Sequence, residues 1–461
     1  MIFEEKNIQY IIKKIREQIK GTMFEGKVFV VGGAVRDAIM GFPIKDLDLV
    51  VEMRSGGIAL ANYLAAKNQC WKLDKNPVIF ETYGTAKLNI YNDEICKNYD
   101  LEFVQTRKEQ YHLESRNPDT VFGTLEEDAK RRDLTINSIY YNISNDTLFD
   151  PNNGGNDIHR KIIRTPNDPD VIFFDDALRM LRCIRFSARY NWGIEKDTWF
   201  GIVKNSYRIS TITKERINDE LSKILVSPNA SVGIMKLYHC GLLHRVLPDV
   251  YELTKVYESK DKGITLFDHT LKVLEETQPI LEHRLAALFH DIGKVIGADK
   301  TIDINKFSAD IAASDLKELK FSNQIIKAVE LAIKNHDYFS IYADGVLPSD
   351  KKIRKFINAC GDYIAITLDL MNANNFHKTY GSKKRQVLDV INQMESLNEV
   401  EKMSNVKLPI NGNDLQKEFN LKKGPWIGTI LNEVKEAYFE NPNISKDECF
   451  EIAEKTLKKI Y

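Results

Sequence analysis

The sequence lacks the features that mark several specialised classes of protein. Its six cysteines are scattered and form no CxxC pair, which fits neither a disulfide framework nor a zinc knuckle and favours reduced thiols in a cytoplasmic protein. No window approaches the roughly 18 apolar residues of a membrane-spanning helix. Residues 1–20 mix acids and bases instead of forming a targeting segment. The sequence therefore predicts neither secretion nor a membrane partner.

An excess of charge of one sign is also absent. Lys and Arg number 65 and Asp and Glu 66, so the net charge is −1, and any surface for a nucleic acid must come from local segregation of charge. Hydrophobic residues form 43% and charged residues 28% of the 461 residues, as in soluble globular proteins. A chain of this length predicts about two to four domains.

The chain changes character near Asp150. Residues 1–150 alternate short β-branched runs with helical stretches, which predicts a mixed α/β head. The predicted strands cover residues 28–31, 47–51, 78–80, 86–90, 101–105 and 136–141. Later residues place apolar side chains at helical spacing, and the breaks between them predict three helical modules over residues 151–250, 251–400 and 401–461. The predicted fold class is α+β.

A glycine pair follows the first predicted strand. Residues 28–37 read as a strand, a turn at Gly32 and Gly33, and the start of a helix. Such a turn aims backbone N–H groups and a helix N-terminus at one point, which suits a phosphate. A glycine pair before a helix is also a common structural turn, so the pair by itself leaves both interpretations open.

Two aspartates on the second predicted strand favour the phosphate interpretation. Asp46 and Asp48 stand two positions apart, and the period of two along a strand puts both carboxylates on one face. Like charges that project together repel unless cations lie between them, and a magnesium pair that bridges a triphosphate is the usual occupant. A solvated strand end is the alternative. Glu102 or Asp100 could supply a third acid, or be a solvated acid at a strand edge.

Arginines dominate two later segments. Arg131 and Arg132 precede Asp133; arginine forks suit phosphate oxygens, and an aspartate can accept from ribose hydroxyls. A helix C-terminus on the surface is the alternative. Residues 175–189 read as one helix whose cationic stripe consists of Arg179, Arg182, Arg185 and Arg189. Such stripes are usually solvated faces, but no acid interrupts this one.

Together these segments resemble the class II tRNA nucleotidyltransferases, the family of bacterial and eukaryotic CCA-adding enzymes and their poly(A) polymerase relatives. Residues 32–37 followed by Asp46 and Asp48 resemble the catalytic motif, and residues 131–133 the ribose-selecting motif. Further matches, in the family's order, are a hinge at residues 150–157, a template motif at 175–179, a neck signature at 215–220, and C-terminal elements at 409–412 and 424–428. One departure is Asp175, where the family usually has glutamate.

The resemblance implies a fold and a reaction. The fold would be a polymerase-β-type nucleotidyltransferase head, an all-α neck, an HD-like body and a tail that binds tRNA. Asp46 and Asp48 would hold Mg²⁺ while the 3′-hydroxyl of an RNA attacks the α-phosphorus of a nucleoside triphosphate and pyrophosphate leaves. The residues implied to bind the nucleotide are Gly32, Gly33, Arg36, Arg132, Asp133, Asp176, Arg179 and Arg182. Among them, Arg132 and Asp133 would select the ribose.

Asp176 and Arg179 are the residues that the resemblance assigns to base reading. Three positions apart on a helix, they would face one ligand side by side, one accepting and one donating hydrogen bonds. Cytosine and adenine each offer an exocyclic amine beside a ring-nitrogen acceptor, so this pair would bind CTP and ATP without a nucleic-acid template. An intrahelical salt bridge is the alternative.

The second helical module carries a pattern that resembles the HD metal-dependent phosphohydrolases. It consists of His269, His290, Asp291 and Asp369. Imidazoles and carboxylates of this kind could ligate a second divalent metal, with His336 as a further candidate. Enzymes with an active HD site often have another histidine where this sequence has Ala309, which cannot ligate. That loss argues against hydrolysis at this site.

The leading hypothesis is a template-independent enzyme that adds C, C and A to the 3′ end of tRNA from CTP and ATP. Residues 107–124 resemble the flexible loop of complete CCA-adding enzymes, but an A-adding enzyme or a poly(A) polymerase stays open. A phosphohydrolase that works through the HD module is a second hypothesis, and an RNA-binding protein on an inactive polymerase scaffold is a third. We expect tRNA to be recognised by shape and phosphate contacts, because the major groove of its A-form acceptor stem is closed to side chains.

Overall fold

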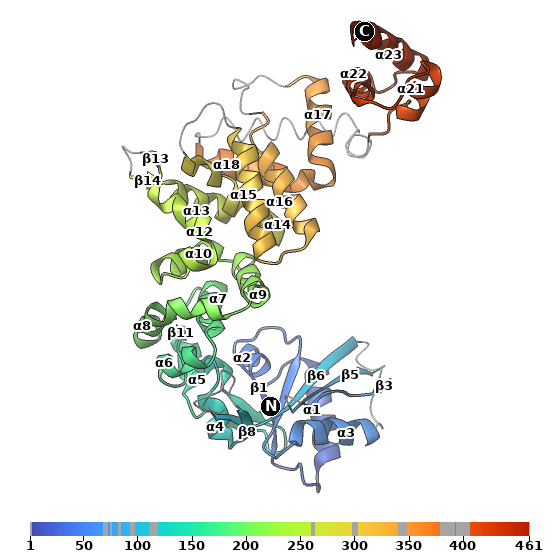
Figure 1. Ribbon diagram of the computed structural model, residues 1–461. Coiled ribbons are helices and arrows are strands. Elements are labelled where there is room, and N and C mark those ends of the chain that lie inside the picture. Colours follow the sequence, from blue (N-terminus) through green and yellow to red (C-terminus); the bar gives the residue numbers. More distant parts are fainter. Residues whose placement is uncertain are drawn as a thin grey trace. The chain divides into compact units, whose positions relative to one another are not determined.

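The computed structural model divides the chain into two compact units, Met1–Val246 and Leu247–Tyr461 (Figure 1). The structure describes residues 2–67, 72–73, 76–81, 84–92, 97–110, 119–259, 263–296, 303–339, 348–378, 392 and 406–460. One mixed sheet lies in the first unit and helices form most of the rest, so the predicted α+β class is confirmed. The finer division into four modules stays a prediction.

The first unit is built on a sheet with strand order β10-β9-β1-β2-β6-β5-β3, and β4 also pairs with β5. Its strands are β1 (Val28–Val31), β2 (Leu47–Val51), β3 (Lys72–Leu73), β4 (Val78–Phe80), β5 (Thr85–Asn92), β6 (Lys97–Gln105), β9 (Tyr140–Asn142) and β10 (Leu148–Phe149). β2 and β6 run parallel, and the other neighbours pair antiparallel.

The structure corrects the predicted strand at residues 136–141. Thr135–Asn137 form a 3-10 turn (η2), and β9 begins only at Tyr140. The Thr135 hydroxyl donates to Asp157 at 2.7 Å, and the Ser138 hydroxyl donates to the Thr135 carbonyl at 2.8 Å. One local bond and one bond to the distant Asp157 hold the backbone in a turn although its residues favour a strand. Of the predicted flexible loop, 107–110 and 119–122 pair as β7 and β8, while residues 111–118 lie outside the described residues.

The two faces of the sheet bury different residues. Leu47, Leu49 and Val51 point into the larger core, which α1 (Lys6–Ile19) and α3 (Gly56–Lys67) cover. Val50 points to the opposite face and packs in the core beside α4 (Leu125–Lys130). Because side chains alternate along a strand, Asp48 shares the face of Val50, away from α1.

Helices complete the first unit. They are α5 (Gly154–Arg160), α6 (Pro169–Asp175), α7 (Leu178–Tyr190), α8 (Lys196–Asn205), α9 (Lys214–Leu225), α10 (Ala230–His239) and α11 (Leu243–Val246), with the short strand pair β11 (Ile162–Ile163) and β12 (Gly193–Ile194). α7 contacts both α9 and α10 and buries a continuous apolar side. Residues 175–189 were predicted as one helix. In the structure α6 ends at Asp175 and α7 begins at Leu178, so the segment belongs to two helices.

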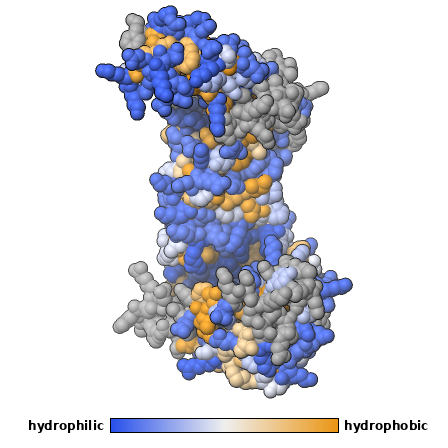
Figure 2. All heavy atoms as spheres, turned by 90° about the vertical axis from the view of Figure 1, so that its right-hand side faces the viewer, coloured by the Kyte–Doolittle hydropathy of each residue, from blue (hydrophilic) through white to orange (hydrophobic). Residues whose placement is uncertain are grey.

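The second unit is helical. Its helices are α12 (Pro248–Glu252), α13 (Leu266–Glu276), α14 (Leu281–Phe289), α15 (Ile304–Glu318), α16 (Asn323–Asn335), α17 (Asp350–Cys360), α18 (Ile364–Lys378), α21 (Gly412–Glu418), α22 (Pro425–Glu440) and α23 (Lys446–Ile460), with strands β13 (Tyr257–Ser259) and β14 (Ile264–Thr265). A separate apolar core joins α21, α22 and α23. None of the described helices is long and apolar enough to span a bilayer. On the face shown in Figure 2, hydrophilic residues predominate.

Candidate functional site

A cavity of about 550 Å³ opens over the face of the sheet that carries Asp48. Strands β2, β5 and β6, the helix α2 (Gly33–Ile39) and the segment after α2 supply most of its wall. Charged residues dominate the lining, which includes Arg36, Asp37, Lys45, Asp46, Asp48, Lys87, Asp100, Glu102 and Arg189. The structure therefore brings the predicted acids Asp46, Asp48 and Glu102 to one cavity.

The strand register explains how these acids meet. β6 places Glu102 opposite Asp48 of β2, and β5 places Lys87 opposite Glu102. Because paired residues of neighbouring strands project from the same face, the three side chains stand in one row. The Lys87 Nζ lies 3.5 Å from the Glu102 Oε2, whereas Asp100 accepts a 2.7 Å hydrogen bond from Asn89. Of the two candidates for a third acid, Glu102 is the neighbour of Asp48.

Asp48 carries a negative charge that its surroundings do not balance. Burial and the Glu102 carboxylate raise the pKa of Asp48 to about 6, and the Arg132 guanidinium opposes this shift only in part. Asp46 raises the pKa further. A divalent cation between Asp46 and Asp48 would remove the imbalance, and carboxylate oxygens are the ligands that Mg²⁺ prefers. The donor set fits a hard divalent cation.

Gly32 brings the backbone close to Asp48. It precedes α2 with φ 75° and ψ −133°, a conformation that favours glycine. A β-carbon on Gly32 would lie 3.4 Å from the Asp48 Oδ2 and 3.9 Å from the Arg132 Nη1. The predicted glycine turn, the aspartate and the arginine therefore meet at one place, and Gly33 lines the cavity beside them.

Arg36 is mainly a buried link between elements of the first unit. Its guanidinium donates to Asp37 at 2.8 Å and to Asn137 at 2.6 Å. The guanidinium carbon also lies 4.9 Å from the centre of the Phe186 ring. These contacts join α2 to η2 and α7. Arg36 is only 4% exposed, and its contact with a nucleotide stays a prediction.

Asp133, which the resemblance assigns to the ribose, already accepts several hydrogen bonds. The Arg182 Nε donates to its Oδ2 at 2.7 Å, the Asn137 amide donates to both oxygens, and the Leu134 N–H donates to Oδ1. Burial alone would raise the pKa of Asp133, but Arg182 and Asn137 lower it to about 2. The carboxylate is therefore charged and ties η2 to α7.

Acids from other elements neutralise the arginine stripe of α7. The ion pairs are Arg179 with Asp175, Arg182 with Asp133, Arg185 with Glu220 and Arg189 with Asp37, at N···O distances of 3.8, 2.7, 3.2 and 3.9 Å. None of these acids lies on α7 itself, which is why the sequence of this helix looks purely cationic. The stripe is an ion-pair network within the first unit.

Asp176 and Arg179 do not share a helix, contrary to the prediction. Asp176 follows α6 in an extended conformation, and its Oδ1 accepts a 3.1 Å hydrogen bond from the Leu178 N–H at the start of α7. Its Oδ2 lies 2.7 Å from the Nη2 of Arg216, whereas Arg179 donates to the Ile172 carbonyl. The hydrogen bond from the Leu178 N–H to the Asp176 side chain competes with the helical backbone at this point and overrides the continuous helical pattern. Their joint reading of a base stays a prediction.

Sequence reasoning missed Asp128 of α4. This buried carboxylate accepts hydrogen bonds from the guanidinium groups of Arg131 and Arg132 and from the Tyr140 hydroxyl. The signal that could have found it is spacing, because an acid three and four positions before two arginines can pair with both on a helix. Asp128 therefore holds Arg132, a predicted nucleotide ligand, by its Nε and Nη2 atoms.

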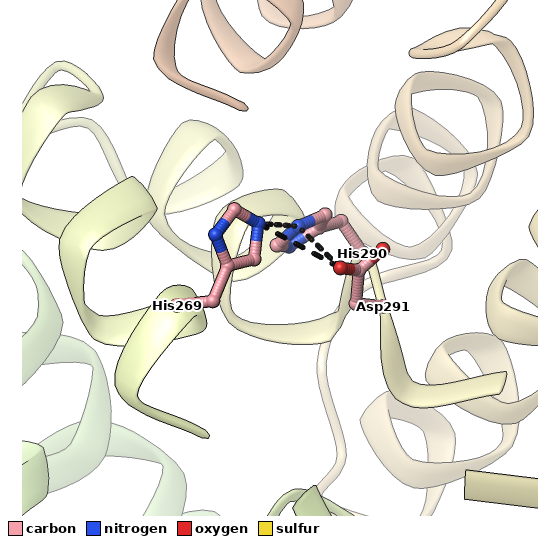
Figure 3. A group of neighbouring side chains, drawn as sticks. All are labelled: His269, His290 and Asp291. Carbon is pink, nitrogen blue, oxygen red and sulfur yellow. Dashed lines mark hydrogen bonds and ion pairs between the residues drawn. The ribbon is translucent and has the colours of Figure 1, made fainter. Parts of the chain in front are cut away.

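Three of the predicted HD residues lie together in the second unit. Figure 3 shows His269 of α13 facing His290 and Asp291, which follow α14. The Nε2 atoms of the two histidines are 3.4 Å apart. The Asp291 Oδ2 lies 3.7 Å from the His269 Nε2 and 3.3 Å from the His290 Nε2. Within the described ranges, no other trio of His, Cys, Asp or Glu places its candidate ligand atoms within 4.8 Å of one another.

Asp369 does not belong to this histidine cluster, which corrects the prediction. Its Oδ2 accepts hydrogen bonds from the Gln278 N–H at 2.9 Å and from the His283 Nδ1 at 2.7 Å. Asn374 reaches the cluster instead, with its Oδ1 3.1 Å from the His269 Nε2. Five positions along a helix turn a side chain by about 140°, so these two residues of α18 meet different neighbours.

Protein groups already compensate the charge of the cluster. The Lys294 Nζ lies 2.5 Å from the same Asp291 oxygen that faces the histidines. His336 stacks edge-on against His290, with 5.5 Å between the ring centres. Burial lowers the pKa of His336 to about 4, so this ring is neutral. Ala309 is buried in α15 and offers no ligand atom.

Comparison with known proteins assigns a family. Residues 28–164 match the Poly A polymerase head domain, residues 192–253 the probable RNA and SrmB-binding site of polymerase A, and residues 302–450 the tRNA nucleotidyltransferase domain 2. The CCA-adding enzyme of Ligilactobacillus salivarius is 29% identical, over 99% of this chain and 98% of its own. The chain belongs to the tRNA nucleotidyltransferase and poly(A) polymerase family.

Further relatives of this nucleotidyltransferase extend the comparison. The mitochondrial CCA tRNA nucleotidyltransferase of Candida glabrata is 28% identical, over 91% of this chain and 88% of its own. The crystal structure of the Bacillus stearothermophilus CCA-adding enzyme in complex with CTP superposes with a TM-score of 0.67 at 21% identity and covers 99% of each chain. The nucleotidyltransferase thus has the fold of that enzyme along its whole length.

Proposed function

We propose that this nucleotidyltransferase adds C, C and A to the 3′ end of tRNA without a template, using CTP and ATP as donors. The row of acids in the cavity carries the proposal, because the raised pKa of Asp48 beside Glu102 marks a carboxylate that would gain from a divalent cation. The CCA-adding relatives, which align over nearly their full length, support it.

The residues of the cavity would divide the work of nucleotidyl transfer. Asp46 and Asp48 would hold Mg²⁺, which neutralises charge on the transferring phosphoryl group. Because Gly32 has no side chain, the point between Asp48 and Arg132 that a β-carbon would fill is left for a phosphate oxygen to approach. Attack by the RNA 3′-hydroxyl then needs little more than alignment, since phosphoryl transfer depends mostly on positioning and charge neutralisation.

Selection of the nucleotide would use residues that are already paired. Asp133 would accept from a ribose hydroxyl, and Asp176 with Arg179 would read the base of CTP or ATP. Asp176 now pairs with Arg216, and Arg179 lies 3.8 Å from Asp175. Binding of a base would exchange these ion pairs for hydrogen bonds to its exocyclic amine and ring nitrogen. Arg182, which holds Asp133, would couple the two selections.

Two further expectations concern the partner and the compartment. We expect tRNA to bind through its shape and phosphates, with an affinity that falls as salt rises. The cytoplasm remains the expected compartment, although the Candida glabrata relative is named as mitochondrial. A divalent metal at His269, His290 and Asp291 is a separate prediction, and we do not propose hydrolysis there because Lys294 already neutralises Asp291.

The test is addition of labelled CTP and ATP, separately and together with Mg²⁺, to tRNA that ends before CCA and to tRNA that ends in CC. We expect three nucleotides on the first substrate only when both triphosphates are present. Extension of the CC-ended tRNA alone by one A would instead identify an A-adding enzyme, and long A tails a poly(A) polymerase. No extension of either tRNA would contradict the proposed function.

A further inference from the structure

We propose that Asp128 is a positioning residue that aims the guanidinium of Arg132 at the phosphates of the bound nucleotide. This inference rests on the proposed function, since it concerns the triphosphate that the first unit would bind. Asp128 lies on α4, outside the lining of the cavity. Its role follows from the hydrogen bonds of one fully buried carboxylate.

The Asp128 carboxylate fixes one edge of Arg132. The Nε and Nη2 atoms of Arg132 donate to the Asp128 Oδ2 at 3.1 and 3.0 Å. The Tyr140 hydroxyl donates to the same oxygen at 2.8 Å and accepts from the Arg132 Nε at 3.0 Å. A guanidinium whose Nε and Nη2 atoms both donate to one carboxylate oxygen, and whose Nε also bonds to a hydroxyl, has little freedom to rotate.

The remaining edge of Arg132 faces the place where phosphates would lie. Its Nη1 lies 3.9 Å from the point that a β-carbon on Gly32 would occupy, and the Asp48 Oδ2 lies 3.4 Å from that point. The turn at Gly32 keeps this point open. An anion there would contact Arg132 directly and Asp48 through a divalent cation. Arg132 therefore faces phosphate, while Asp133, bonded to Arg182, is left for the ribose.

The second oxygen of Asp128 anchors the whole arrangement. The Asp128 Oδ1 accepts from the Arg107 N–H at 3.2 Å and from the Nε and Nη2 of Arg131 at 3.0 and 2.5 Å. The Asp128 side chain is 0% exposed, against 18% for Arg132. The other donors hold the Asp128 carboxylate in one orientation, and the carboxylate in turn holds the guanidinium of Arg132. A substitution at Asp128 should therefore move this guanidinium.

The experiment compares Asp128→Asn with the wild type in binding of inorganic triphosphate, a probe without base or ribose. Calorimetry in the presence of Mg²⁺ should show affinity about tenfold weaker, the usual loss when a supporting partner is removed. The KM for CTP should rise by a similar factor while the KM for tRNA stays unchanged. Unchanged triphosphate binding by folded Asp128→Asn protein would overturn the inference.

Asp146→Asn is the matched control. Asp146 accepts from Arg16 and from the Tyr141 hydroxyl, the same two kinds of donor that Asp128 has, but neither of these donors lines the cavity or lies beside Gly32. Asp146→Asn should bind triphosphate as the wild type does. If both variants bind triphosphate equally weakly, Asp128 has only a structural role and the inference is wrong. If Asp128→Asn does not fold, Tyr140→Phe should weaken binding about threefold, because it removes the hydroxyl that donates to Asp128 and accepts from Arg132.

The binding experiment also separates this inference from the proposed function. A wild-type protein that binds triphosphate but extends no tRNA would refute the proposed function and leave the comparison of variants valid. A wild type that extends tRNA, with Asp128→Asn equal to it in triphosphate binding, would refute the inference alone. If Asp128→Asn is unfolded, a Tyr140→Phe protein with the triphosphate affinity of the wild type would refute the inference as well.

Discussion

The cavity of the first unit and the histidine cluster of the second offer similar metal ligands but treat their charges differently. In the cavity, Asp48 stands beside Glu102, and burial raises its pKa to about 6. In the cluster, Asp291 has an ammonium group 2.5 Å away, and His269 contacts an amide oxygen of Asn374. The lysine of the first arrangement, Lys87, pairs with Glu102 and leaves the pKa of Asp48 raised, whereas in the second a lysine pairs directly with the acid that faces the histidines.

This difference shows that charge balance, and not residue type alone, distinguishes the two candidate metal sites. Carboxylates and imidazoles are ligands for divalent metals in either unit. A metal that binds a salt-bridged carboxylate must first displace the lysine that pairs with it, which costs free energy. A metal that binds a carboxylate without such a partner does not have this cost. The cavity is therefore the stronger candidate, even though its acids form no cluster within 4.8 Å in the described part of the chain.

Removal of the uncompensated charge should have the largest effect. Asp48→Asn should lower nucleotide addition by about a thousandfold, because it loses several kcal/mol of charge stabilisation in the transition state. Its thermal stability should equal or exceed that of the metal-free wild type, since a buried charge beside Glu102 disappears. Initial rates of CTP incorporation and calorimetric unfolding measure the two effects.

The control for this variant is Asp219→Asn on α9. Asp219 is an exposed partner of Lys223 and does not line the cavity. It should leave both the rate and the thermal stability close to those of the wild type. Retention of addition by Asp48→Asn would mean that the charge imbalance in the cavity has no catalytic purpose.

Acid should weaken metal binding in the cavity. Because the pKa of Asp48 is about 6 in the folded protein, protons compete with the metal below that pH, and affinity should fall about tenfold per pH unit. Calorimetric titration with Mn²⁺ at about pH 5 and about pH 7 measures this fall. The slope should be absent in Asp48→Asn, and an affinity independent of pH in the wild type would contradict the assignment.

The same pKa predicts how the metal-free protein responds to pH. The folded pKa of about 6 lies above the ordinary aspartate value of 3.8, so the folded state binds more protons than the unfolded state between these values. The contribution of Asp48 to stability is full below about pH 4 and is lost as the pH rises through about 6. The difference in unfolding free energy between Asp48→Asn and the wild type should therefore grow over this window.

Residues placed by a local sequence pattern could be predicted. Partners that only the tertiary fold brings close could not. The alternation along the second predicted strand put Asp46 and Asp48 on one face, although β2 begins only at Leu47. Glu102 was a candidate because it lies near the start of the predicted strand 101–105. The ion pairs of α7 with acids on other elements could not be read from its sequence, because they depend on tertiary packing. The prediction that Asp176 shares a helix with Arg179 was wrong for a local reason, since the Asp176 side chain accepts from the nearby Leu178 N–H and interrupts a pattern that otherwise looks continuous.

We expect the histidine cluster to bind metal weakly, because Lys294 already neutralises Asp291. Lys294→Met removes the ammonium group from Asp291 and keeps most of the apolar stem, so uptake of Zn²⁺ or Mn²⁺ should rise about tenfold. Metal analysis after dialysis against a defined metal buffer measures it. Lys255→Met, which removes a lysine paired with Glu252 on the same unit, is the control. Equal metal content in all three proteins would show that Lys294 does not set occupancy.

Asp369 should affect stability and not metal uptake, the smallest of the expected effects. Its carboxylate accepts from the Gln278 N–H and the His283 ring, and asparagine can keep only part of this pair, so Asp369→Asn should lower the free energy of unfolding by about 1–2 kcal/mol. His283→Gln should destabilise to a similar extent, because it breaks the same contact from the other side. Denaturant unfolding and metal analysis of both variants distinguish the roles. Loss of metal from the cluster in Asp369→Asn, with unfolding unchanged, would place Asp369 among the ligands and make the two metal sites more alike than their charges indicate.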